Sequence, residues 1–166
     1  MTAICLRDNT LHAFGDALPS IEVIAFALSH LNRFTGHVGQ YSVAQHCVHA
    51  SHLVGPEDLR LAALLHDAPE AIYGDLSSPL KGYLGSDRLF QLEQHYHDLI
   101  DIEYGVQTRH SAVKDCDLRL LVTEAKAFEL PLDYFPPFEP YEYDIVRWSP
   151  TIAEQAFLDQ FRRLTA

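Results

Sequence analysis

Apolar residues recur every three or four positions along most of the chain, which is the spacing of amphipathic helices. In the first such run, Ile21, Ile24, Leu28 and Leu31 share one helical face, and this pattern predicts a helix over 20–34. Alternation of apolar and polar residues, the pattern of a half-buried strand, is not sustained anywhere. The hydrophobic pattern therefore predicts an all-α fold.

Capping residues and prolines indicate where the other helices begin and end. Ser42, followed three residues later by Gln45, has the spacing of a capping box, and Gly55 and Pro56 are expected to end that helix. Pro69 cannot lie inside a helix without the loss of a backbone hydrogen bond, so the next helix is expected to kink or stop near residue 67. The further helices are expected over 56–67, 86–104, 109–130 and 150–164.

Two segments do not follow the helical pattern. Residues 74–85 are expected to form an ordered loop with one short turn of helix. Residues 131–144 are rich in proline and aromatic residues, so we expect an irregular but packed segment, because disordered segments usually lack aromatic side chains. No repeat or linker divides the sequence, which predicts a single domain over 1–166.

Charge and cysteine content narrow the class of protein. The chain has 23 acidic and 12 basic residues and a net charge of −11, which argues against binding to long nucleic acids. No apolar run approaches the roughly 20 residues that span a bilayer. Three cysteines without CxxC spacing indicate neither a disulfide framework nor a thiolate zinc site. We therefore expect a cytoplasmic protein with no membrane partner.

The segment LAALLHDAPEAIYGD places His66 and Asp67 next to each other in an otherwise apolar stretch. Neighbouring helical residues point about 100° apart, so both can reach one ion only in a groove between helices. A mixture of imidazole and carboxylate suits Zn, Mn, Fe or Co. A buried histidine neutralised by a carboxylate is the alternative, and the dipeptide alone favours it.

The further candidate ligands are His46, His49, His52, Asp115 and Asp117. The histidines that we interpret as surface or packing residues are His12, His30, His95 and His97.

Three sequence motifs together are similar to those of the HD-domain phosphohydrolases. They are SVAQH over 42–46, the pattern HDxxExxxGDxxxPxK over 66–81, and Asp117 in DLRLLVTEA. The chain most resembles the small bacterial and phage branch that contains 5′-deoxynucleotidases and dATP triphosphohydrolases. The resemblance implies an HD-domain helical bundle of about six or seven helices.

The resemblance also implies the ligands of a divalent metal ion. They are His46, His66, Asp67 and Asp117, so Asp117 is preferred to Asp115. The expected ion is Zn, Co or Mn, with Mg as a possible second ion. Glu70, four residues after His66, is implied to be catalytic together with Asp67. On sequence alone, Glu70 is equally well explained as an acidic residue in the first turn of a helix.

The same resemblance implies a set of substrate-binding residues. Arg33 is expected to contact phosphate and Phe34 to pack on the sugar, where the deoxynucleotidases carry Trp. Arg33 is otherwise explained as a cation at a helix C-terminus, and Phe34 as a core residue. The other candidate substrate contacts are His37, Asp75, Pro79 and Lys81, each of which also suits an ordinary loop or turn.

The sequence thus predicts a metal-dependent phosphohydrolase of (deoxy)nucleoside 5′-phosphates. It leaves open whether the substrate is a monophosphate or a triphosphate. The alternatives are a non-catalytic nucleotide or metal sensor, an HD-type di-iron oxygenase using His49 and His52, and, less favoured, a phosphodiesterase. The expected partner is a small-molecule nucleotide, and the resemblance implies a homo-oligomer, either a dimer or a hexamer.

Overall fold

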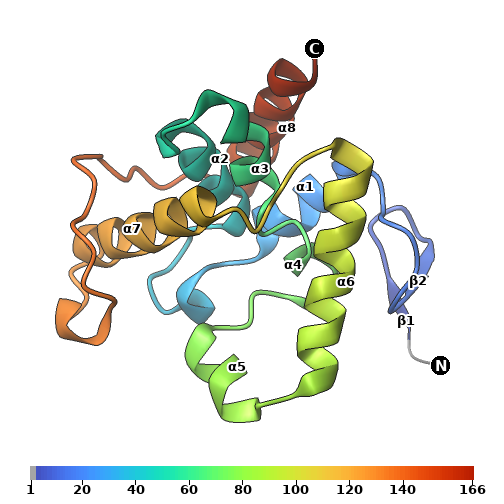
Figure 1. Ribbon diagram of the computed structural model, residues 1–166, viewed down its shortest axis with the longest axis horizontal. Coiled ribbons are helices and arrows are strands. Elements are labelled where there is room, and N and C mark those ends of the chain that lie inside the picture. The colour runs from blue at the N-terminus through green and yellow to red at the C-terminus, as the bar shows by residue number, and fades with distance from the viewer. Residues whose placement is uncertain (1–2) are drawn as a thin grey trace.

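The centre of the fold is helix α2 (Val43–Leu53), in which residues 43–51 are all buried. The computed structural model describes residues 3–166. Around α2 lie α1 (Ile21–His30), α3 (Arg60–Leu65), α7 (Ser111–Ala127) and α8 (Pro150–Thr165) (Figure 1). Because α2 is covered on several sides, the polar side chains that it carries inward are removed from water.

The remaining helices lie beside this group. They are α4 (Glu70–Tyr73), α5 (Ser78–Leu84), α6 (Asp87–Tyr104) and the 3₁₀ helices η1 (Phe34–Gly36), η2 (Glu57–Leu59) and η3 (Leu132–Tyr134). In Figure 1, α6 runs nearly perpendicular to α7, and α5 lies below α7 beside one end of α6. Residues 3–166 contain eight α-helical segments, because the short α4 and α5 add to the expected six or seven. The all-α prediction is confirmed.

A small hairpin was not predicted. β1 (Ala3–Cys5) and β2 (Leu11–Ala13) pair in antiparallel fashion, with Ile4 opposite His12. Strands of three residues are too short to show a sustained alternation of polar and apolar positions, so the hydrophobic pattern does not reveal them. The hairpin is a small addition at one edge of the all-α fold.

Serine residues cap several helices as the sequence indicates. Ser42 Oγ accepts the backbone N–H of Gln45 at 3.2 Å, and Ser149 does the same for Ile152. The second half of the expected capping box is absent, because Gln45 does not reach back to Ser42. Its side-chain amide instead donates to the Val146 carbonyl at 2.6 Å and accepts from the Trp148 N–H at 3.0 Å. Gln45 thus attaches the residues just after the 131–144 segment to α2. Within that segment, the Tyr141 N–H donates to Thr123 Oγ1 at 2.8 Å and the Tyr143 ring lies 5.0 Å from His49, so the segment is packed against the helices.

Replacement of Ser42 by alanine is expected to lower the free energy of unfolding by about 1 kcal/mol, the usual cost of a lost N-cap. The hydroxyl is fully buried, so water cannot replace it at the Gln45 N–H. Equilibrium urea unfolding of the two proteins measures the change. An unaltered unfolding midpoint at an unaltered slope would show that this cap contributes nothing.

The first helix is shorter than predicted. It ends at His30, because Leu31 adopts an extended conformation and Asn32 pairs with Ser42 in an isolated bridge. Arg33 therefore does not lie at a helix C-terminus, and that explanation of it was wrong. Phe34 and Thr35 follow with φ of 54° and 53°, a left-handed conformation that strains residues other than glycine.

Pro69 divides the predicted third helix. α3 ends at Leu65, and Pro69, with φ of −55°, starts α4. Residues 66–68 form a turn between the two helices. The predicted break near residue 67 is confirmed, and it places His66 and Asp67 at the end of α3, where the chain changes direction.

Two other helices differ from their expected limits or length. α7 starts and ends inside the predicted 109–130, since Glu129 has a φ of 58° that no helix accommodates. Residues 74–85 contain α5, which at seven residues is longer than one turn. Within residues 3–166, none of the helices is long and apolar enough to cross a membrane.

Candidate metal centre

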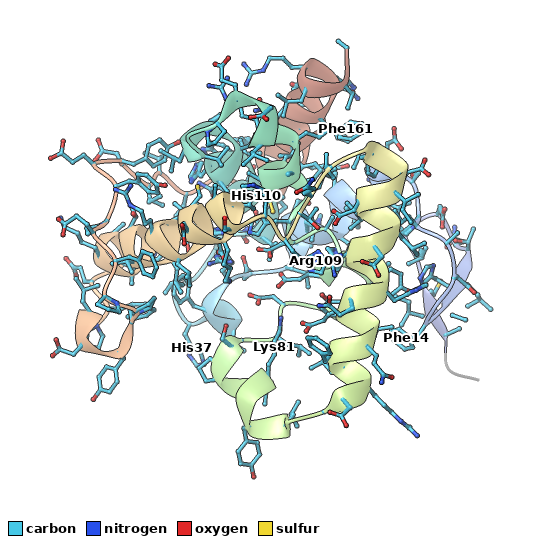
Figure 2. The ribbon with its side chains drawn as sticks, in the orientation of Figure 1. Phe14, His37, Lys81, Arg109, His110 and Phe161 are labelled. Atoms are coloured by element: carbon cyan, nitrogen blue, oxygen red, sulfur yellow. The ribbon has the colours of Figure 1, made fainter. Side chains whose placement is uncertain are left out.

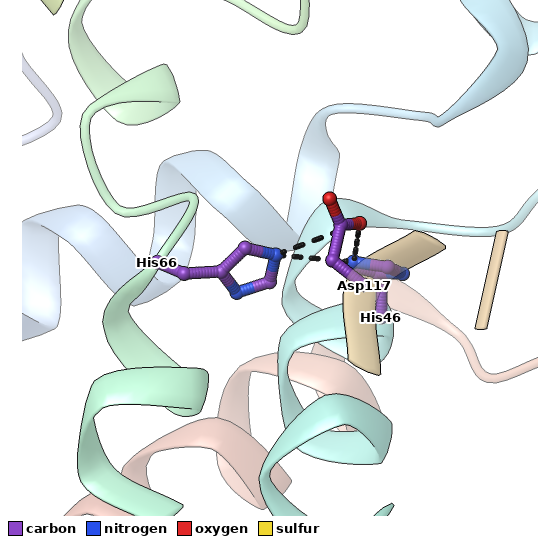
Figure 3. A group of neighbouring side chains, drawn as sticks. All are labelled: His46, His66 and Asp117. Carbon is purple, nitrogen blue, oxygen red and sulfur yellow. Dashed lines mark hydrogen bonds and ion pairs between the residues drawn. The ribbon is translucent and has the colours of Figure 1, made fainter. Parts of the chain in front are cut away.

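Four side chains from three parts of the chain converge beneath α7. His46 comes from the middle of α2, His66 and Asp67 from the turn after α3, and Asp117 from the second turn of α7. Figure 3 shows the rings of His46 and His66 directed toward the carboxylate of Asp117. His46 is fully buried, and the other three are nearly so, with side-chain exposures of 8%, 19% and 16% for His66, Asp67 and Asp117.

Donor atoms of His46, His66 and Asp117 form one close group, and Asp67 Oδ2 adjoins it next to the two imidazoles. His46 Nε2 lies 3.3 Å from His66 Nε2, 3.3 Å from Asp117 Oδ1 and 3.7 Å from Asp67 Oδ2. His66 Nε2 lies 3.3 Å from Asp67 Oδ2 and 3.8 Å from Asp117 Oδ1. Ligand atoms about 2.1 Å from a tetrahedral ion are separated by about 3.4 Å, so these spacings fit one divalent ion.

The second nitrogen of each ring supports the same conclusion. His46 Nδ1 lies 2.5 Å from Glu124 Oε1, and His66 Nδ1 lies 2.8 Å from the Ala63 carbonyl oxygen. Both partners only accept hydrogen bonds when Glu124 is ionised, so each Nδ1 carries the proton and donates it. In the neutral rings, both Nε2 lone pairs then face the two carboxylates. This donor set can hold a metal ion.

The other candidate ligands lie elsewhere. Asp115 is exposed on α7, and His52 is exposed near the end of α2. His49 is buried against Tyr143 and Trp148, with ring centroids 5.0 and 5.1 Å away, and burial lowers its pKa to about 4. The structure therefore groups Asp117, and not Asp115, with the two imidazoles.

Cys47 belongs to a second possible group of donors, with His66 and Asp67. Its thiol is fully buried, and burial raises its pKa to about 11. A metal ligand must be a thiolate. The His46 group, which contains no thiol, is the stronger candidate centre.

The protonation of the cluster depends on its own charges. Burial disfavours the charged form of His66, but the Asp67 carboxylate and hydrogen bonding to Asp117 raise its pKa well above the ordinary value. Burial likewise opposes ionisation of Asp117, but contacts with His46 and His66 lower its pKa well below the usual range. Without an ion, the carboxylates thus hold a proton on the imidazole pair.

A bound ion must displace that proton, because imidazole coordinates through an unprotonated nitrogen. We therefore expect metal affinity to rise with pH and to fall as the pH drops through the raised pKa of His66. Calorimetric titrations in buffers of different ionisation enthalpy measure the protons released. A pH-independent affinity with no proton release would contradict this protonation scheme.

Glu70 lies beside the cluster in the first turn of α4. Its residue exposure is 7%, and its Oε2 is buried without a hydrogen-bond partner among the described residues. Burial raises the pKa of Glu70 well above its usual range, and the nearby Asp67 and Asp75 add to the shift. The carboxyl group therefore keeps its proton to higher pH than an ordinary glutamate does.

Two cavities meet at the cluster. The larger has a volume of about 510 Å³ and lies on the side of α5 and η3. The smaller has a volume of about 260 Å³ and lies between α4, α6 and the start of α7. Five side chains line both cavities: Asp67, Glu70, Lys81, Lys114 and Asp117. The candidate ion position is thus open to two different spaces.

Most of the predicted substrate contacts line these cavities. Arg33, Phe34, Asp75 and Pro79 line the larger cavity, and Lys81 lines both. The ring of Phe34 makes edge contacts with Phe128 and Phe135, at centroid distances of 6.0 and 6.3 Å.

His37 and Lys81 differ from the other predicted contacts. Figure 2 labels His37 beside η1, where it is exposed and lines neither cavity. The left-handed turn over Phe34 and Thr35 directs the chain away before His37 is reached. Lys81, also labelled there, is within the site but already paired with Glu93 at 2.6 Å.

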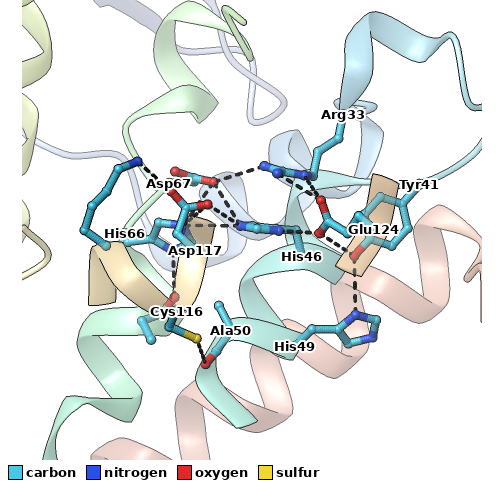
Figure 4. A network of polar contacts seen from close by, with 12 residues as sticks. Arg33, Tyr41, His46, His49, Ala50, His66, Asp67, Cys116, Asp117 and Glu124 are labelled. Carbon is cyan, nitrogen blue, oxygen red and sulfur yellow. Dashed lines mark hydrogen bonds and ion pairs between the residues drawn. The ribbon is translucent and has the colours of Figure 1, made fainter. Parts of the chain in front are cut away.

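Several residues of the site were not predicted. Glu124 is fully buried and contacts His46, Tyr41 and Arg33 (Figure 4). It lies seven residues after Asp117, two helical turns along the same face of α7, and this spacing was the available signal. Lys114 pairs with Asp117 Oδ2 at 2.7 Å.

His97 also lines the smaller cavity, although the sequence indicated a surface or packing role. Its Nδ1 lies 2.9 Å from Thr108 Oγ1, and that hydroxyl donates to Asp101 at 2.7 Å. Arg109, which forms ion pairs with Asp98 and Asp101, lies on the same wall. Only the folded contact between α6 and the start of α7 brings these polar groups to the site.

Comparisons with known proteins place the chain in a family. No protein-family model matches it. It is 35% identical over 154 residues to the Uncharacterized protein YfdR of Escherichia coli (strain K12), which covers 87% of this chain and 84% of YfdR. The chain belongs to the YfdR family. A second relative in Rhodobacter capsulatus, also named as uncharacterized, is 34% identical over 95 residues, or 52% of this chain and 48% of its own length. Neither name states an activity, so for this YfdR-family chain the functional argument depends on the site.

Proposed function

We propose that this protein is a metal-dependent phosphohydrolase of nucleoside 5′-phosphates. The observation that carries the proposal is the convergence of His46, His66, Asp67 and Asp117 at the junction of two cavities, with the carboxyl group of Glu70 beside them. The sequence resemblance to HD-domain phosphohydrolases assigns metal binding to the same four residues. Geometry and sequence therefore support one site.

The donor set is that of Zn, Co or Mn, with two imidazole nitrogens and two carboxylate oxygens. Such an ion polarises a phosphoryl oxygen and lowers the pKa of water at the site. Glu70 is placed to donate its proton to the leaving oxygen, because its raised pKa keeps it protonated to higher pH than an ordinary glutamate. Lys114 and Arg33 supply cations on either side of the reacting phosphate.

The larger cavity suits the nucleoside. Its volume of about 510 Å³ lies within the range of small-molecule sites, and much of its wall is apolar. The apolar residues that line it are Phe34, Leu76, Pro79, Leu118, Leu121, Tyr134, Phe135 and Pro136. Asp75, which lines this cavity, can accept a hydrogen bond from a sugar hydroxyl.

The smaller cavity favours a substrate with more than one phosphate. It is polar, and the cationic side chains of Lys81, Arg109 and Lys114 line it together with the carboxylates with which Lys81 and Lys114 pair. With the nucleoside in the larger cavity and the reacting phosphate at the ion, this second space can accommodate further phosphates. We therefore propose a deoxynucleoside triphosphate as the preferred substrate over the monophosphate.

The alternatives receive less support. A di-iron oxygenase needs additional histidine ligands, but His49 is enclosed by aromatic rings and His52 is exposed. A non-catalytic sensor would not need a buried, unpartnered carboxyl such as Glu70 beside the metal ligands.

A panel of deoxy- and ribonucleoside mono- and triphosphates, each with Zn, Co, Mn or Mg, tests the proposal. The expected result is metal-dependent release of inorganic tripolyphosphate from a triphosphate, identified by phosphorus NMR. Release of orthophosphate from monophosphates alone would overturn the preference for triphosphates. Binding of metal and nucleotide without turnover would support the sensor instead.

A further inference from the structure

Glu124 is a charged group that the proposed chemistry does not use. It lies in the last part of α7, its side chain has no exposed surface, and it accepts four polar contacts. Oε1 faces His46 Nδ1 at 2.5 Å and the Tyr41 hydroxyl at 2.7 Å. Oε2 faces Arg33 Nε and Nη2, both at 3.0 Å. A buried carboxylate is costly unless it is paired in this way.

The contact between Glu124 and His46 determines which nitrogen of His46 is free to bind an ion. An ionised Glu124 can only accept, so the His46 proton lies on Nδ1 and the lone pair on Nε2. This Nε2 is the atom that faces His66, Asp67 and Asp117. Carboxylates that orient a metal-binding histidine in this way typically contribute 10–100-fold to metal affinity.

The contact between Glu124 and Arg33 determines which guanidinium nitrogen of Arg33 is free to bind a substrate. Nε and Nη2 are held by Glu124, which leaves Nη1 on the side of Asp67, at 3.7 Å from Oδ2. Arg33 also lines the larger cavity. Directly after Arg33, Phe34 and Thr35 have a left-handed backbone conformation that is costly for residues other than glycine.

We propose that Glu124 is a positioning residue that orients two groups at once, the metal ligand His46 and the phosphate contact Arg33. The inference rests on the proposed function for the role of Arg33, whereas the effect on His46 needs only that the centre binds metal. Since one carboxylate holds both groups, removal of its charge weakens the binding of metal and the binding of phosphate.

Tyr41 completes the arrangement from the opposite side. Its hydroxyl donates to Glu124 Oε1 and lies 3.3 Å from His49 Nδ1. The ring is fully buried and packs edge-on against Phe128 at 5.0 Å. This contact fixes the carboxylate plane without reaching either cavity.

The test uses Glu124→Gln in the full-length chain, with Thr123→Val as the matched control. Thr123 is the neighbouring buried residue on α7. Its hydroxyl donates to the Arg119 carbonyl and accepts from the Tyr141 N–H, away from the centre. Cobalt affinity is measured by competition with a chromophoric chelator, without substrate. Orthophosphate affinity is then measured at saturating cobalt.

We expect Glu124→Gln to weaken cobalt binding by about 10–100-fold and also to weaken orthophosphate binding. For Thr123→Val, we expect both affinities to stay within about twofold of those of the parent chain. Unchanged cobalt affinity in Glu124→Gln would overturn the role at His46. Weakened cobalt binding with unchanged orthophosphate affinity would overturn the role at Arg33. A parent chain that binds cobalt but hydrolyses no nucleotide would contradict the proposed function and leave the metal part of this inference standing.

A measurement on the unsubstituted protein covers the case in which Glu124→Gln does not fold. Long-range proton–nitrogen NMR correlations identify the protonated nitrogen of each imidazole. The inference requires His46 to carry its proton on Nδ1 in the cobalt-free and zinc-loaded protein. An unprotonated Nδ1 on His46, or zinc bound through that atom, would overturn it.

Discussion

Replacement of Asp67 by alanine is expected to abolish metal binding and hydrolysis together. Asp67 Oδ2 lies 3.3 Å from His66 Nε2 and 3.7 Å from His46 Nε2, so it is one of the four atoms around the candidate ion position. Its loss removes a negative charge from a buried centre and leaves three ligands for a doubly charged ion. It also removes the carboxylate that faces Arg33 Nη1.

Metal content after dialysis and phosphate release from the preferred nucleotide measure this effect. Asp115→Ala is the matched control, because Asp115 is an exposed carboxylate on the same turn of α7 as Asp117. The control is expected to retain both metal and turnover. Full activity in Asp67→Ala would refute the ligand assignment.

Replacement of Glu70 by glutamine is expected to leave metal binding intact and to slow turnover by about 10²-fold or more, the usual contribution of a general acid or base. Glutamine has the size of glutamate, so the buried position beside Asp67 stays filled. Only the transferable proton is lost.

The pH profile separates this role from a structural one. Burial, with the charges of Asp67 and Asp75, raises the pKa of Glu70, so its protonated form persists to higher pH than in an ordinary glutamate. The active acid is present below that pKa and is lost as the pH rises through it. Turnover by the parent chain is expected to decline on that alkaline side, and Glu70→Gln is expected to lack the decline. The same decline in both proteins would assign it to another group.

Local sequence signals predicted most of the helices because they depend on neighbouring residues. Ser42 caps α2 and Pro69 ends a helical run whatever the rest of the chain does. The end of α1 at His30 could not be predicted in this way. It depends on the pairing of Asn32 with Ser42, a contact made only in the folded molecule.

The candidate metal ligands could be predicted from the sequence, because they belong to recognisable motifs. The sequence motifs named His46, His66, Asp67 and Asp117. The structure groups His46, His66 and Asp117 and places Asp67 beside both imidazoles. The surroundings of these residues depend on tertiary contacts across long stretches of sequence. Glu124 meets Arg33 across 91 residues, and no local pattern connects them.

The ion pairs of the site could not be predicted from the sequence either. Lys81 was expected to contact phosphate, but its ammonium group is paired with Glu93 on α6. Lys114, which no motif indicated, pairs with the candidate metal ligand Asp117 at 2.7 Å. Such ion pairs depend on how far apart the helices lie, and this distance cannot be derived from local sequence patterns.

An anomalous-difference map from a crystal of the zinc-loaded protein, recorded at the zinc absorption edge, tests the central claim most directly. The account predicts one strong peak at bonding distance from His46 Nε2, His66 Nε2, Asp67 Oδ2 and Asp117 Oδ1. A peak bound by other residues, or no peak at this position in protein that contains stoichiometric zinc, would contradict it.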